Sequence, residues 1–200
     1  MNSRVFSSFI LLFVITGGVV GEDDKTIPAF KQETVPRVVR SDIYMVAGES
    51  LSAVEASMIK RRPFDQFAYA QWHIDWNYSV LIKPEEYRLT EFDVLVQARL
   101  MLPQWDIPDS ALKQTKEEWK RFMDAVILHE NGHVDIGLQA ANEMRKVIAS
   151  RDWVAADKKA LNKAVNAACQ DILEKYQKKE IEYDDLTDHR RTQGASLNTE

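Results

Sequence analysis

The sequence predicts an α+β fold, in which an antiparallel sheet from the N-terminal half packs against helices from the C-terminal half. Apolar residues alternate with polar ones before residue 103, which is typical of half-buried strands, and recur every three or four residues after residue 110, which is typical of helices. The 200 residues are 45% hydrophobic and 28% charged, enough for one domain with a packed core. We expect a single domain over residues 41–200.

Two long alternating segments predict the centre of the sheet. Gln71–Tyr78 places Trp72, Ile74, Trp76 and Tyr78 on one face, and Phe92–Leu102 repeats the pattern. Pro84-Glu85-Glu86 breaks the run between them, so the two segments are expected to form an antiparallel hairpin. Asp42–Val46 is a candidate for an earlier, shorter strand.

Three segments have helical spacing. Ser50 is a suitable N-cap for a short helix over Leu51–Lys60. A longer pattern runs from Trp119 to Val147, and a third from about Asp157 to Lys178. The tail from Glu180 is polar and predicts no further element.

The N-terminus has the organisation of a secretory signal peptide. Arg4 precedes an apolar stretch, Phe6–Val20, and small residues lead to an expected cleavage site near Gly21. A membrane anchor is the alternative, but the stretch is shorter than the roughly 20 residues that a spanning helix requires. We therefore expect a signal peptide over 1–21, a lead-in over 22–40, and a periplasmic or secreted chain without a stable membrane anchor.

Charge and cysteine content exclude some classes of protein. The formal net charge of -5 is spread along the chain without a basic stripe, which argues against nucleic-acid binding. Cys169 is the only cysteine, so the chain has no internal disulfide, and its helical context predicts a small buried apolar residue.

The strongest motif is His129-Glu130-Asn131-Gly132-His133. In a helix, residues four apart project from one face, so both imidazoles can reach one Zn²⁺ ion. Glu130 lies beside them, where it can act as general base toward a water activated by the zinc. The apolar residues before His129 place the motif inside a helix. A chance pentapeptide is the alternative reading, and the low histidine content makes it improbable.

Gly132 is unusual inside a helix, where it costs about 1 kcal/mol relative to Ala. Either a strand or bound substrate passes close to the backbone here, or the glycine is tolerated variation.

A catalytic zinc site usually has a third protein ligand. A metzincin would need Gly at Ile136 and His at Gln139, so that pattern is absent. Position argues against three other candidates. Glu143 is too far along the helix, Glu174 is on the solvent side of its helix, and His73 is on the polar face of a strand. His189, in the polar tail, is the better candidate if the tail folds back over the helix; a surface histidine is the alternative.

These residues resemble a family of proposed bacterial secreted zinc-dependent proteases, metallopeptidase-like proteins with an HExGH motif that were first catalogued as a domain of unknown function. The similarity covers most of the mature chain. It is carried by the segments Asp42-Ile43-Tyr44, Trp72–Trp76, Pro103-Gln104-Trp105, the HExGH motif and Tyr183-Asp184 with Thr187 and His189. The resemblance implies a metallopeptidase-like fold and favours His189 as third ligand. The sequence departs from the family pattern at Arg190, where a Gly commonly follows the histidine.

The expected function is peptide-bond hydrolysis on a peptide or protein substrate, with a zincin-type active-site helix, Glu130 as base and Zn²⁺ held by His129, His133 and His189. Tyr183 could donate a hydrogen bond to the developing oxyanion, or simply pack in the tail. Two rival hypotheses stay open: a zinc-stabilised binding or scaffolding module of the envelope, and hydrolysis of another bond, such as a cell-wall amide.

Overall fold

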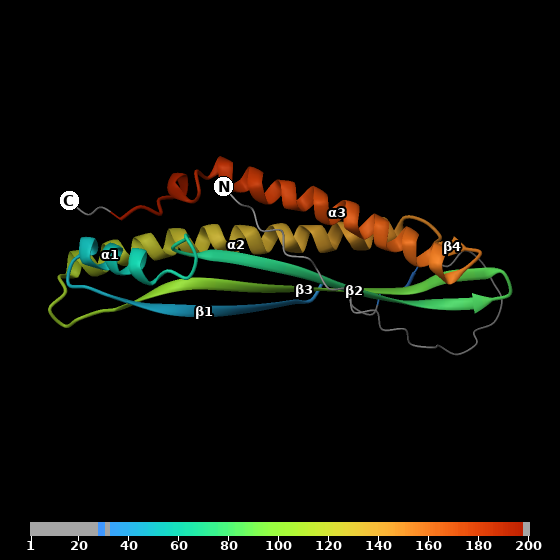
Figure 1. Cartoon of the computed structure of the whole chain (residues 1–200), viewed down its shortest axis with the longest axis horizontal. Coiled ribbons are helices and arrows are strands. Elements are labelled where there is room, and N and C mark those ends of the chain that lie inside the picture. The colour runs from blue at the N-terminus through green and yellow to red at the C-terminus, as the bar shows by residue number, and fades with distance from the viewer. Residues whose placement is uncertain (1–27, 31–32, 198–200) are drawn as a thin grey trace. The chain divides into compact units, whose positions relative to one another are not determined.

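The structure is a computed structural model that describes residues 28–30 and 33–197 (Figure 1). The elements are, in chain order, β1 (Arg37–Ala47), α1 (Leu51–Arg61), β2 (Tyr69–Lys83), β3 (Glu86–Asp106), α2 (Lys113–Ala149), β4 (Val154–Ala155), α3 (Lys158–Leu186) and the short 3₁₀ helix η1 (Arg191–Gln193). Strands precede the long helices, so the α+β class expected from the sequence is confirmed. The expected signal peptide lies outside the described residues.

The sheet is mixed rather than antiparallel, which corrects the sequence prediction. β2 and β3 form the expected hairpin around Pro84 and Glu85. The strand order is β1-β3-β2, and the segment that leads into β1 runs parallel to β3. Ala29 bridges Glu91 in parallel, and farther along both segments the Val96 amide donates to the Pro36 carbonyl. Alternation of side chains says nothing about strand direction, and no tight turn joins β1 to β3.

The strand β1 begins at Arg37, inside the segment expected to be a lead-in, and is longer than the Asp42–Val46 strand expected. Its side chains are almost all exposed or half-buried, and only Val46 is buried. An exposed strand has no apolar alternation, which explains why hydropathy indicated only part of it.

The chain divides into two compact units that share the long elements. The first contains the described residues up to Arg37, together with His73–Gln97 and Leu138–Lys175; the second contains Val38–Trp72, Ala98–Gly137 and the described residues from Tyr176 onward. α2 contributes its N-terminal part to the second unit and its C-terminal part to the first.

In the first unit, β2 is joined to α3 by polar contacts between aromatic and amide side chains. The Trp76 indole donates to the Asn166 side-chain oxygen at 3.1 Å, and the Tyr78 hydroxyl donates to that of Asn162 at 3.0 Å. Cys169 of α3 is free and fully buried, as its helical context predicted. A two-residue strand, β4, pairs antiparallel with the start of β3.

In the second unit, α1 and the N-terminal part of α2 close over β1 and β3. Ser50 caps α1 by accepting a hydrogen bond from the Ala53 amide at 3.3 Å, which confirms the predicted helix start. The Trp105 indole donates to the Gly48 carbonyl at 3.0 Å and packs edge-on against Trp119, with ring centroids 5.9 Å apart. The buried core contains Val46, Val54, Met58, Ala68, Trp105, Ala111, Trp119, Phe122, Ala125, Val126 and Ala195.

Within the described residues, none of the helices combines the length and apolar character needed to cross a bilayer.

Candidate metal centre

The HExxH residues lie in the middle of α2, on the face that the helix buries. His129 and Glu130 are each 2% exposed and His133 is 7% exposed. Their potential ligand atoms all lie within 4.8 Å of one another. The three polar residues continue the stripe formed by Val126 and Val134, so the helical placement expected from the sequence is confirmed. Burying them requires compensation from polar or charged partners.

Those partners come from the C-terminal part of α3. The helix continues to Leu186, so the end expected at Lys178 is wrong by eight residues. Residues spaced by three and four along this part share one face. That face carries Glu180, Tyr183, Asp184 and Thr187, and each of them contacts His129 or His133.

Hydrogen bonds fix the orientation of both imidazoles. His133 Nδ1 lies 3.0 Å from Glu180 Oε2, and a carboxylate can only accept, so Nδ1 carries the proton. His129 Nδ1 lies 3.0 Å from Gln193 Oε1, while the Gln193 amide nitrogen donates to the Tyr183 hydroxyl at 3.0 Å. Because the amide nitrogen is used there, its oxygen faces His129 and accepts. In the neutral rings, both Nε2 atoms therefore present lone pairs.

The two Nε2 atoms converge on one carboxylate oxygen. They are 3.1 Å apart, and each lies 3.2 Å from Asp184 Oδ1. Three acceptor atoms at these distances repel one another unless a cation lies among them.

The pKa shifts of His133 and Asp184 also indicate that this cluster favours a positive charge. Burial opposes protonation of His133, but hydrogen bonds to Asp184 and Glu180 outweigh it and raise the pKa of His133 to about 10. Burial raises the pKa of Asp184, and its hydrogen bonds with the two histidines more than reverse this, so its pKa lies well below the usual range.

Glu130 is set apart from the three converging atoms. Burial raises its pKa, and the nearby charge of Arg190 partly opposes the shift. An Arg190 guanidinium nitrogen lies 3.5 Å from Glu130 Oε1 and donates to the Ala68 carbonyl at 3.4 Å. Arg190 has a φ of 77°, a left-handed conformation that glycine adopts more readily than residues with a side chain.

Gly132 lies beneath the ring of Tyr183. A Cβ atom built at Gly132 would be 2.1 Å from the Tyr183 hydroxyl oxygen and 2.4 Å from Cζ. The close approach is therefore made by a side chain of α3, and neither a strand nor a substrate is needed to explain this glycine.

The Tyr183 ring also stacks on His129, with centroids 5.1 Å apart and planes 19° from parallel. Its hydroxyl donates to the main-chain oxygen of His129 at 3.3 Å. The residue proposed as an oxyanion donor thus lies in the cluster, with its proton directed at the backbone of α2.

His189 lies just beyond the end of α3, and it contributes none of the three atoms that converge. Its side chain is 68% exposed, and its Nδ1 is 3.9 Å from Asp184 Oδ1. Asp188, His189 and Arg190 all have positive φ, so the chain turns sharply after the helix. His73 is half-exposed on β2 and pairs with Asp75 at 2.9 Å, consistent with the polar strand face expected for it.

The segment that follows is held down by Arg121 of α2. Its guanidinium donates to the carbonyls of Gly194 and Ser196, both at 2.8 Å. These bonds place Gln193 over His129. Sequence reasoning did not find Glu180, Asp184, Thr187 or Gln193 as members of the cluster; the three- and four-residue spacing of Glu180, Tyr183, Asp184 and Thr187 was the signal available.

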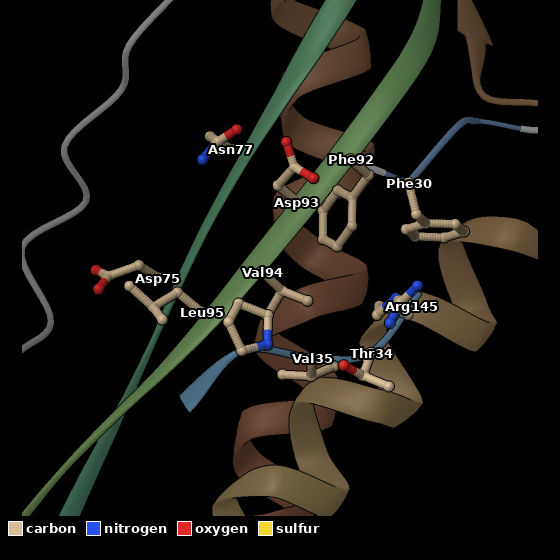
Figure 2. A pocket seen from close by; sticks show the side chains of 11 residues that line it. Phe30, Thr34, Val35, Asp75, Asn77, Phe92, Asp93, Val94, Leu95 and Arg145 are labelled. Carbon is tan, nitrogen blue, oxygen red and sulfur yellow. The ribbon is translucent and has the colours of Figure 1, made fainter. Parts of the chain in front are cut away.

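The first unit has a separate cavity of about 370 Å³ (Figure 2). Figure 2 shows Phe30 and Arg145 on one side and the β2 and β3 residues Asp75 and Phe92 around it; the Arg145 guanidinium lies 4.6 Å from the Phe30 ring centroid. The Asp75 carboxylate already forms hydrogen bonds with the side chains of His73 and Gln97. None of the cavity's lining residues belongs to the HExxH cluster.

Comparison with known proteins identifies the family and nothing more specific. No curated protein and no solved structure matches the chain significantly. One family model matches residues 42–190, which include the HExxH cluster, Asp184 and His189. The chain therefore belongs to the family described as "Bacterial protein of unknown function (DUF922)".

Proposed function

We propose that this chain is a zinc-dependent hydrolase that cleaves peptide bonds in the periplasm or outside the cell. The observation that carries the proposal is the convergence of the His129 and His133 Nε2 lone pairs, 3.1 Å apart in a buried site. Each ring donates its single N–H proton, on Nδ1, to an oxygen acceptor, which is the usual arrangement around metal-binding histidines.

Charge supports a divalent cation at this point. Among the described side chains, the carboxylates of Glu180 and Asp184 contact the two neutral imidazoles, and Arg190 offsets Glu130. When both imidazoles are neutral, as metal binding requires, two negative charges remain in excess in this mostly buried cluster. Buried charge is costly without a partner of opposite sign, and Zn²⁺ has the charge and the preference for imidazole and carboxylate ligands that this cluster requires.

The position of Glu130 favours hydrolysis over a purely structural site. It is 2% exposed, adjacent in sequence to a histidine of the pair, and has no bond to either imidazole ring that would occupy its carboxylate. Burial raises its pKa, which makes the ionised form a stronger base toward water near neutral pH. Bound zinc would supply a Lewis acid that acidifies water and polarises a carbonyl. Glu130 would accept the proton of the attacking water and return it to the leaving amine.

The experiment compares wild type with Glu130→Gln and with Glu174→Gln, a matched control at an exposed position of α3. Zinc is measured by elemental mass spectrometry, and cleavage with a mixed library of quenched fluorescent peptides. We expect stoichiometric zinc in all three proteins and a loss of cleavage in Glu130→Gln alone, by about 10²–10⁴-fold, the usual contribution of a general base. Absence of zinc from the wild type, or full activity in Glu130→Gln, contradicts the proposal.

A zinc-stabilised, non-catalytic module is the second candidate, and the contact between Arg190 and Glu130 favours it because an ion-paired base is less available. Binding of a small hydroxamate separates the two, since a hydroxamate needs an open coordination position. A zinc-loaded chain that binds no hydroxamate and cleaves no peptide supports the structural role.

A further inference from the structure

We propose that Asp184 is the third protein ligand of the metal, in place of His189. The inference rests on the proposed zinc site and adds a ligand that neither the HExxH motif nor the family match assigns.

The geometry of the three converging atoms carries the argument. The sides of the triangle formed by the two Nε2 atoms and Asp184 Oδ1 measure 3.1, 3.2 and 3.2 Å. Ligands at about 2.0–2.1 Å from a tetrahedral zinc ion are separated by about 3.3 Å. The three atoms thus already have nearly the spacing of one face of a zinc tetrahedron, and the fourth position is left for water or substrate.

The position of Asp184 on α3 explains why this carboxylate is the one presented. Glu180 lies one turn before it and holds His133 Nδ1. Thr187 lies nearly one turn after it, where its hydroxyl is 3.3 Å from His129 Nδ1. Asp184 therefore occupies the middle of a helical face that contacts both imidazoles, and regular helical geometry determines its distance to them.

His189 lacks these constraints. It follows the end of α3, adopts a φ of 47° and has a side chain that is 68% exposed. Its Nδ1 reaches the cluster only at 3.9 Å from Asp184 Oδ1. To be the third ligand it would have to take the corner of the triangle where Asp184 Oδ1 already lies 3.2 Å from both Nε2 atoms.

The test uses three variants of the full chain: Asp184→Asn, which keeps the shape and removes the charge; His189→Ala; and Asp185→Asn, the exposed neighbouring aspartate, as control. Zinc affinity is measured by competition with a chromophoric chelator. We expect Asp184→Asn to weaken zinc binding by at least about a hundredfold, more than the loss of an outer-sphere contact does. His189→Ala and Asp185→Asn are expected to keep wild-type affinity. A large loss in His189→Ala with none in Asp184→Asn overturns the inference.

X-ray absorption at the zinc edge of the wild type gives an answer even if Asp184→Asn fails to fold. Two imidazoles and an oxygen ligand support Asp184, and three imidazoles overturn it. The outcomes also separate this inference from the proposed function. If the zinc has three imidazole ligands and cleavage depends on Glu130, the hydrolase proposal is supported and the assignment of Asp184 is wrong. If the zinc has two imidazoles and a carboxylate but the protein cleaves no peptide, the assignment of Asp184 is supported and the hydrolase proposal is wrong.

Discussion

The ring of Tyr183 lies directly over Gly132, so closely that a Cβ at position 132 would be 2.1 Å from the tyrosine hydroxyl oxygen. This contact joins α3 to α2 in the middle of the HExxH motif. The same ring stacks on His129 and approaches His133 edge-on, with centroids 5.1 Å apart in both cases. The absence of a side chain at Gly132 thus allows the two helices to approach at the site.

Gly132→Ala is expected to destabilise the chain, although Ala is the better helix former. The built Cβ would be within 2.8 Å of three Tyr183 atoms, so the clash should cost up to about 3 kcal/mol, more than the ~1 kcal/mol gained from helix propensity. In a Tyr183→Ala background the clash is gone, so the same substitution should become stabilising. Urea unfolding of the four proteins of this cycle measures the reversal of sign. A stabilising Gly132→Ala in the wild type would show that the ring does not lie over this glycine.

Glu180→Ala is expected to weaken zinc binding without removing a ligand. Glu180 Oε2 accepts the Nδ1 proton of His133, and loss of such an outer-sphere bond typically costs about 10–100-fold in metal affinity. Glu180→Gln keeps an oxygen acceptor and should lose less. Glu182→Ala, on the exposed side of the same turn, is the control. Equal zinc affinity in Glu180→Ala and Glu182→Ala would contradict an orienting role for Glu180.

The thiol of Cys169 is expected to be unreactive in the folded chain. Burial raises its pKa from 9.0 to about 12. Three pKa units reduce the thiolate fraction at about pH 8 by roughly a thousandfold, and the thiolate is the reactive species. The rate of reaction with a disulfide reagent should therefore rise sharply in concentrated urea. Equal rates with and without urea would show that Cys169 is accessible in the folded state.

Ser50→Ala should lower the free energy of unfolding by about 1 kcal/mol, since the Ala53 amide loses its acceptor at the start of α1. Ser50→Asp supplies a carboxylate acceptor at the same position and should retain most of the stability. Denaturant midpoints of the three proteins give the comparison. If alanine and aspartate have the same effect, capping is not the role of this side chain.

Local patterns were sufficient for much of the fold. The alternation from Phe92 to Leu100 gave the buried face of β3, because side chains of a strand point to opposite faces whatever its partners are. Ser50 marked the start of α1 for an equally local reason. The direction of β1 depends on its pairing with β3, which involves residues more than fifty positions away in the sequence. Local patterns do not contain this information, so the prediction of an antiparallel sheet was wrong.

The end of α3 was missed because its buried face changes character. Up to Tyr176 that face is apolar and gives a periodic signal. Beyond it, the residues that contact α2 are Glu180, Tyr183, Asp184 and Thr187, which match polar groups of the HExxH motif. A hydropathy pattern identifies faces buried against apolar neighbours, so a helical face buried against histidines reads as a polar tail.

The sequence by itself determined that His129 and His133 share one face of a helix beside Glu130, because 3.6 residues per turn place positions four apart together in any α-helix. Only the tertiary structure decided which residue completes the set. Asp184 and His189 are only five positions apart, so their distance from the motif along the chain does not choose between them. The packing of α3 on α2 brings Asp184 Oδ1 to 3.2 Å from both Nε2 atoms, while the side chain of His189 is 68% exposed. The identity of the third ligand depends on contacts between segments some fifty residues apart. The spacing of residues within either segment does not predict those contacts.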